Sequence, residues 1–108
     1  MKISDEDVEK AMDFLRDHAT AAAQARANRL YLEDFSKSLK AILMNERAMD
    51  SLGAQERYAL SHPRYQEHLA VLRIAVEDDE KQRFLLDAAK VKIDVWRSLS
   101  ARERAGLP

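Results

Sequence analysis

The fold is decided by residues 5–47, DEDVEKAMDFLRDHATAAAQARANRLYLEDFSKSLKAILMNER, a stretch that contains neither glycine nor proline. As a single helix it would be roughly 60 Å long at 1.5 Å per residue. Ser4 precedes it, and Asp7 follows three residues later, which is the spacing of a capping box with Asp in place of Glu or Gln. We therefore predict a helix from about residue 5 to about residue 48.

Apolar residues recur along this stretch with alternating spacings of three and four, the pattern of a heptad seam. The predicted seam consists of Ala11, Phe14, His18, Ala21, Ala25, Asn28, Leu32, Phe35, Leu39 and Ile42. A second stripe runs beside its first half and comprises Val8, Met12, Leu15, Ala19 and Ala22. The combined face is wider than one partner helix needs, which favours a bundle.

Asn28 is the polar member of this predicted seam. A buried amide at one seam position commonly fixes the register or the oligomeric state of a coiled coil at a cost in stability. An asparagine at the rim that faces water fits the sequence equally well, so both interpretations stay open.

The helical rhythm breaks over residues 49–62, where Asp50-Ser51-Leu52-Gly53 is rich in turn-forming residues. Residues 54–60 are predicted to form a short helix inside this corner. Pro63 suits the first position of a new helix, and residues 63–104 contain no further glycine or proline. Gly106 and Pro108 then match the residues that commonly follow a helix end.

The second long helix has an apolar seam in two halves separated by a polar stretch, residues 77–83. The seam residues are Tyr65, Leu69, Leu72, Val76, Leu86, Ala89, Ile93 and Trp96. If the chain folds back at the corner, the polar stretch lies opposite residues 25–33. Arg26 and Arg29 could then pair with Asp79 or Glu80.

These elements predict an all-α fold in which two long antiparallel helices form a helical hairpin, with residues 1–108 as one domain. A lone hairpin would leave the flanking apolar stripes in water, although burying apolar surface contributes about 25 cal/mol per Å². We therefore expect a homodimer in which two hairpins form a four-helix arrangement.

Composition limits the classes of function. The formal net charge is -1, so bulk electrostatics give no attraction to nucleic acid or to anionic membranes, and there is no cysteine. No apolar run approaches the roughly 18 residues of a membrane span. The acidic N-terminal residues lack the apolar segment of a signal peptide, which predicts a cytoplasmic location.

No arrangement of catalytic, cofactor-binding or metal-ligating residues stands out. His62 and His68 are six residues apart and do not share a helical face, and His18 is distant in the sequence. The consecutive carboxylates of residues 77–80 point in different directions on a helix, so they do not converge on one ion. The sequence also lacks a glycine-rich loop, and we predict that the protein is not an enzyme and needs no cofactor.

Aromatic residues near the corner and near the C-terminus are the predicted contacts for a protein partner: Tyr58, Tyr65 and Trp96, together with Arg97. An alternative is direct binding of single-stranded DNA by Arg97, Arg102 and Arg104, beside an aromatic ring on which a base can stack. Acidic residues interrupt every basic stretch, which favours the protein partner.

Three segments of the chain resemble segments of known proteins, namely residues 54–57, 61–65 and 88–98. They hold the sequences AQER, SHPRY and AAKVKIDVWRS. In this order they resemble a group of small helical bacteriophage and prophage proteins that are often encoded near single-strand annealing recombination genes. The resemblance implies an accessory or scaffold role in DNA recombination or replication, in the cytoplasm of a bacterial host. It carries over no functional residues, and inhibition of a host protein is a further alternative.

Overall fold

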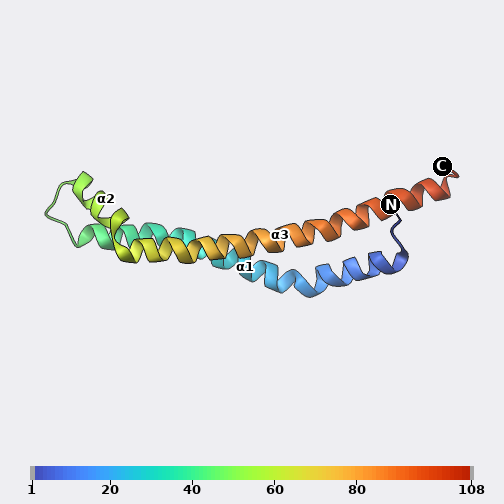
Figure 1. The fold of residues 1–108 in the computed structure, drawn as a ribbon, viewed down its shortest axis with the longest axis horizontal. Coiled ribbons are helices and arrows are strands. Elements are labelled where there is room, and N and C mark those ends of the chain that lie inside the picture. The colour runs from blue at the N-terminus through green and yellow to red at the C-terminus, as the bar shows by residue number, and fades with distance from the viewer. Residues whose placement is uncertain (1, 108) are drawn as a thin grey trace. The chain divides into compact units, whose positions relative to one another are not determined.

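The computed structural model describes residues 2–107 and contains three α-helices, with no β-strand in that range (Figure 1). Helix α1 spans Asp5–Asn45, α2 spans Leu52–Ser61 and α3 spans Pro63–Arg104. The predicted all-α hairpin of two long helices joined by a corner with a short helix is therefore confirmed. The bounds predicted for the second long helix are correct, whereas α1 ends three residues early and α2 extends the predicted short helix at both ends. Pro108 lies outside the described residues.

Contacts within the chain divide it into two compact units. The terminal unit contains the described residues up to Ala23 and from Glu80 onward, and the corner unit contains Gln24–Asp79. In the terminal unit the start of α1 packs beside the end of α3, and in the corner unit the end of α1 packs beside the start of α3. The two long helices are therefore antiparallel within each unit.

Local hydrogen bonds explain where α1 and α3 begin and end. The backbone N–H of Asp7 donates to Ser4 Oγ over 3.1 Å, and the N–H of Ser4 donates to Asp7 Oδ2 over 3.0 Å, so the predicted capping box is present. Past the end of α3, Gly106 has a φ of +70°, and the N–H of Leu107 donates to the carbonyl of Arg102 over 3.0 Å. This left-handed turn closes the helix as a Schellman motif does.

The buried face of α1 follows a heptad pattern whose phase differs from the predicted seam. Its buried and half-buried positions at alternating spacings of three and four are Val8, Ala11, Leu15, His18, Ala22, Ala25, Arg29, Leu32, Ser36, Leu39 and Leu43. Every second predicted position is correct, and the others lie one residue too early. Asn28 and Ile42 are exposed, while Arg29 and Leu43 point inward. Two apolar stripes adjoin in this sequence, and only packing against α2 and α3 decides between them.

Helix α3 shows the same pattern without an interruption. Its inward positions are Tyr65, His68, Leu72, Ala75, Asp79, Gln82, Leu86, Ala89, Ile93, Trp96 and Ser100. Residues 77–83 were predicted to be a polar part of the seam, and Asp79 and Gln82 do occupy seam positions as its polar members. The predicted seam residues Leu69 and Val76 flank the true seam residues His68 and Ala75.

The tightest packing is in the corner unit. Leu39, Leu43 and Ala59 are buried and form a cluster that joins the end of α1 to α2. Half-buried hydrophobic side chains pack against this cluster, namely Phe35, Met44, Tyr58 and Tyr65. The small side chain of Ala59 lets α2 approach α1 closely, which fixes the corner.

Candidate protein-binding sites

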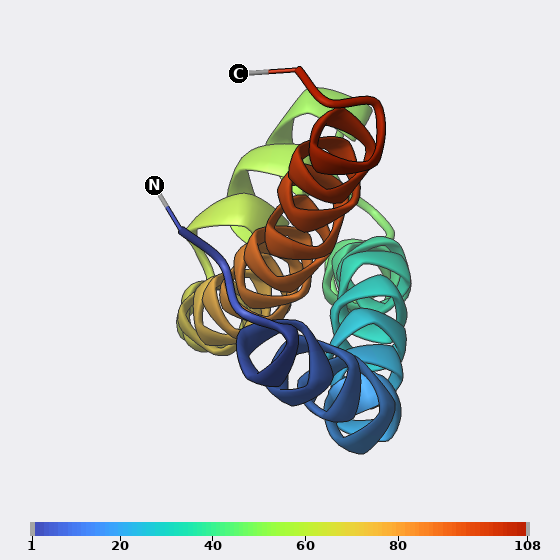
Figure 2. The ribbon, with the colours of Figure 1, turned by 90° about the vertical axis from the view of Figure 1, so that its right-hand side faces the viewer.

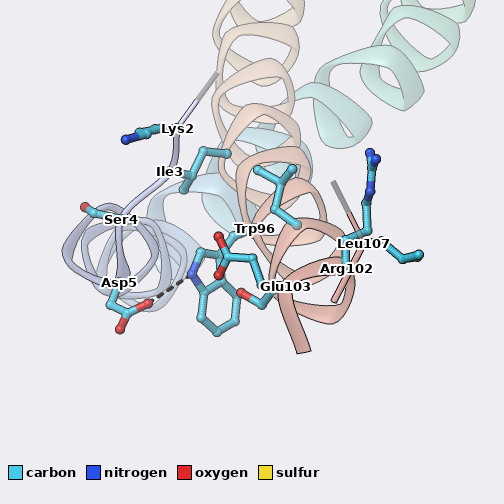
Figure 3. A pocket seen from close by; sticks show the side chains of 10 residues that line it. Lys2, Ile3, Ser4, Asp5, Trp96, Arg102, Glu103 and Leu107 are labelled. Carbon is cyan, nitrogen blue, oxygen red and sulfur yellow. Dashed lines mark hydrogen bonds between the residues drawn. The ribbon is translucent and has the colours of Figure 1, made fainter. Parts of the chain in front are cut away.

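A pocket of about 580 Å³ lies in the terminal unit, between the segment that leads into α1 and the last turns of α3 (Figure 3). Figure 2 shows the ribbon of both segments, the blue start of the chain and the red end of α3. Its apolar lining comes from Ile3, Trp96, Leu99 and Leu107, and its polar lining from Lys2, Ser4, Asp5, Ser100, Arg102 and Glu103. The pocket therefore combines an apolar surface with polar and charged groups that could fix the orientation of a bound group. We call this site the Trp96 pocket.

Two local structures shape the Trp96 pocket. The indole Nε1 of Trp96 donates a hydrogen bond to Asp5 Oδ1 over 3.1 Å, which holds the ring beside the first turn of α1 (Figure 3). The left-handed turn at Gly106 redirects the chain after α3, so that Leu107 returns to line the pocket. A side chain with a Cβ would strain the backbone at that φ, so this wall depends on glycine.

The charges around the Trp96 pocket are mixed. Lys2 and Arg102 contribute positive charge, and Asp5 and Glu103 contribute negative charge. Such a lining does not select strongly for a cation or an anion. It suits a large apolar side chain whose neighbouring polar groups can pair with either sign of charge.

The structure brings only some of the predicted contact residues together. Trp96 and Arg102 line the same pocket. Arg97 does not line it, is largely exposed, and forms an ion pair of 3.7 Å with Asp94 on its own helix. Arg104 is exposed at the end of α3 and is likewise not part of the lining.

Tyr58 and Tyr65 lie in the corner unit, where both rings pack against the buried cluster. The hydroxyl of Tyr58 donates to Glu46 Oε2 over 3.0 Å, and the guanidinium of Arg47 lies 4.7 Å from the centre of the same ring. These contacts give Tyr58 a structural role at the corner. Its predicted contact with a partner, like that of Tyr65, stays a prediction.

A second concave surface was not predicted from the sequence. A shallow groove of about 310 Å³ runs between α1 and α3 in the terminal unit. It is lined by Lys10, Ala11, Phe14, Leu85, Ala88, Ala89 and Lys92. The signal that could have identified it is a further set of apolar residues on α3 at heptad spacing, outside the seam.

Polar residues pair inside the seam of the corner unit. Arg29 Nη1 lies 2.9 Å from Asp79 Oδ2, and the side chain of Asp79 is only 6% exposed. The prediction that Arg26 or Arg29 would meet Asp79 or Glu80 is confirmed for this pair. His68 is buried as well, and its Nε2 lies 2.6 Å from Ser36 Oγ. Both pairs join α1 to α3, so they fix the register between the two helices.

In the described residues 2–107, no three His, Cys, Asp or Glu side chains gather closely enough to hold a metal ion. Over the same range, no helix has the length and the apolar character that crossing a bilayer requires. No protein-family model, no curated protein and no solved structure matches the chain.

Proposed function

We propose that the protein is a non-catalytic accessory protein that binds another protein through its helical faces, with the Trp96 pocket as the main contact. The observation that carries this proposal is the pocket itself, which has a volume of about 580 Å³ and has the indole of Trp96 and the side chain of Leu107 in its lining.

Exposed apolar side chains outside the pocket support the same proposal. Large apolar residues are exposed on all three helices, among them Tyr31, Leu52 and Phe84. Burying exposed apolar side chains against a partner is favourable. The Trp96 pocket adds a concave site with an aromatic ring, and tryptophan is one of the residues that most often carry binding energy in interfaces.

The partner we expect inserts a large apolar side chain between Trp96 and Leu107. The resemblance to phage proteins makes a recombination or replication enzyme the first partner to test. Site-specific photo-cross-linking tests the proposal: a cross-linking amino acid replaces Leu107 in one variant and Met12 in the matched control. Both side chains are 58% exposed and belong to the terminal unit, but Met12 does not line the pocket.

We expect a discrete cross-linked protein from the variant at position 107 and none from the control. Trp96 is the only tryptophan in the chain. Adding the partner that cross-linking identifies, purified on its own, should therefore change the tryptophan fluorescence of the wild-type protein. Equal cross-linking from both positions, or an unchanged fluorescence signal, would refute the Trp96 pocket as the contact.

Single-stranded DNA binding is the second candidate, because Arg102 and the aromatic ring of Trp96 line one pocket. A base stacked on the indole and a phosphate near the guanidinium would use both groups. In that case a labelled oligonucleotide should bind at low salt and dissociate as the salt concentration rises. Arg102→Gln should weaken this binding, whereas Arg73→Gln, on an exposed part of α3 in the corner unit, should not.

A further inference from the structure

Helix α3 carries two exposed stripes of four residues outside its buried seam. In the corner unit, Glu67, Val71, Ile74 and Asp78 follow one another at spacings of four, three and four, and we call them the acidic stripe. All four are exposed, Val71 by 52% and Ile74 by 62%. Apolar residues in the middle and a carboxylate at each end give this stripe the pattern of a helix contact surface.

In the terminal unit, Lys81, Leu85, Ala88 and Lys92 follow the same spacing, and we call them the basic stripe. They are also exposed, and Leu85 is exposed by 41%. Three of the four line the 310 Å³ groove, where Phe14 of α1 forms the facing apolar wall. The basic stripe therefore contributes one side of this groove, and Lys81 extends the stripe beyond it.

We propose that the acidic stripe of one copy docks on the basic stripe of a second copy, so that two α3 helices pair antiparallel in a symmetric homodimer. In one register all four positions match. Glu67 lies opposite the second copy's Lys92, and Asp78 opposite its Lys81. Val71 lies opposite Ala88, and Ile74 opposite Leu85. Because both stripes lie on α3, the same four pairs recur on the other side of the two-fold axis, as an isologous interface requires.

None of the four charged residues of the two stripes takes part in an ion pair within 4.0 Å among residues 2–107. Lys92 does attract the carboxylate of Asp7 in α1, but at a longer range than an ion pair. Many other charges on the long helices do pair with neighbours, as Arg97 does with Asp94. The four side chains are thus available to a second copy, and opposite charges at matching positions specify the partner and the orientation of helix pairs.

The apolar pairs supply the burial. In the proposed register Ile74 of the second copy enters the groove beside Leu85 and Phe14, and Val71 covers Ala88. A small residue in the groove opposite a larger one on the docked helix lets the two helices approach closely.

Charge exchange tests the register directly. Glu67→Lys would place two ammonium groups opposite each other where Glu67 meets Lys92 of the second copy. Lys92→Glu would place two carboxylates there. Each variant alone should therefore sediment as a monomer at tens of micromolar. In an equal mixture of the two variants, each of these pairs again joins an ammonium group to a carboxylate, and the mixture should sediment as a heterodimer. The control Lys90→Glu makes the same change of charge at an exposed position outside the stripe and should remain a dimer.

Disulfide formation tests the orientation independently, because the chain has no cysteine of its own. A mixture of Val71→Cys and Ala88→Cys chains should form a covalent heterodimer on mild oxidation, whereas Val71→Cys alone should not cross-link. Far-ultraviolet circular dichroism verifies that each variant is folded. A wild-type monomer at tens of micromolar, or a dimer that the charge exchanges leave intact, would overturn the proposal. Neither result would bear on the Trp96 pocket, which is tested separately by cross-linking.

Discussion

Replacing Asp79 by alanine should destabilise the protein by about 2–3 kcal/mol, because it leaves the guanidinium of Arg29 inside the seam without its carboxylate. Removing one partner of a buried ion pair typically costs about 3–5 kcal/mol. Two features of the site reduce that value. The Arg29 side chain is still 20% exposed, and its Nε lies 3.3 Å from Glu33 Oε1, which can partly replace the lost charge. For a chain of this length the loss corresponds to a fall in Tm of roughly 10–20 °C.

The double variant Arg29→Leu/Asp79→Leu should behave in the opposite way. Apolar side chains in place of a buried pair are often neutral or stabilising by about 1–4 kcal/mol. Urea unfolding followed by circular dichroism at one fixed protein concentration measures both variants, since self-association would make the apparent stability depend on concentration. The control is Asn28→Leu, which alters the exposed residue beside Arg29 and should change stability by less than about 0.5 kcal/mol.

This reasoning would be refuted if the control changed the stability and Asp79→Ala did not. If Asn28→Leu stabilised the protein by more than about 1 kcal/mol while Asp79→Ala had no effect, position 28 would lie in the seam. The helix phase described above would then be wrong by one residue.

Three further outcomes follow from burial and from the N-terminal cap. Leu43→Ala should lower the free energy of unfolding by about 3 kcal/mol, because Leu43 is fully buried. Ile42→Ala should lower it by less than about 1 kcal/mol, because Ile42 is half exposed. Equal losses for the two variants in urea unfolding would contradict the packing. Asp7→Ala should lower Tm at neutral pH, because the backbone N–H of Ser4, and then its hydroxyl, lower the pKa of Asp7 below 3.8 in the folded state. A lowered folded-state pKa stabilises the fold at every pH above 3.8, and this stabilisation is lost as the pH falls through the folded-state value. The difference in Tm between Asp7→Ala and the wild type should therefore shrink in acid, and a gap that stayed constant from about pH 7 to about pH 2 would contradict the role of the charge.

The helices themselves could be predicted from the sequence because their signals are local. Ser4 and Asp7 form the expected capping box, and Pro63 begins α3 as predicted. The end of α1 was harder to predict, since no glycine or proline marks Asn45. After that residue the chain continues in hydrogen-bonded turns, with the N–H of Arg47 donating to the carbonyl of Met44. A composition that favours helix is therefore not enough to place this boundary.

The phase of the seam could be predicted only in part. Apolar stripes adjoin on α1, so Phe35 and Ile42 fit a heptad as well as Ser36 and Leu43 do. The deciding contacts come from elsewhere in the chain: Ala59 of α2 packs with Leu43, and His68 of α3 pairs with Ser36. Such contacts between distant residues leave no trace in the local periodicity of a single helix.

The central residue of the candidate site was predicted from the sequence, whereas the residues that form its walls were not. Trp96 was identified as an anchor, and it does line the pocket with Arg102. Ile3 and Leu107 were not identified, because they reach the site only when both ends of the chain meet beside α3. The one local signal was Gly106, whose left-handed conformation turns Leu107 back toward the helix.

The polar middle of α3 shows why a one-residue difference in phase matters for function. Asp78 and Asp79 are neighbours, yet consecutive helical residues point about 100° apart. Asp79 therefore turns inward and pairs with Arg29, while Asp78 is exposed. The same chemical group then sets the register within one chain and, in the proposed dimer, the register between two chains. The two roles can be separated by experiment: Asp79→Ala should destabilise the fold, whereas Asp78→Lys should leave urea unfolding of the monomer unchanged and abolish the dimer.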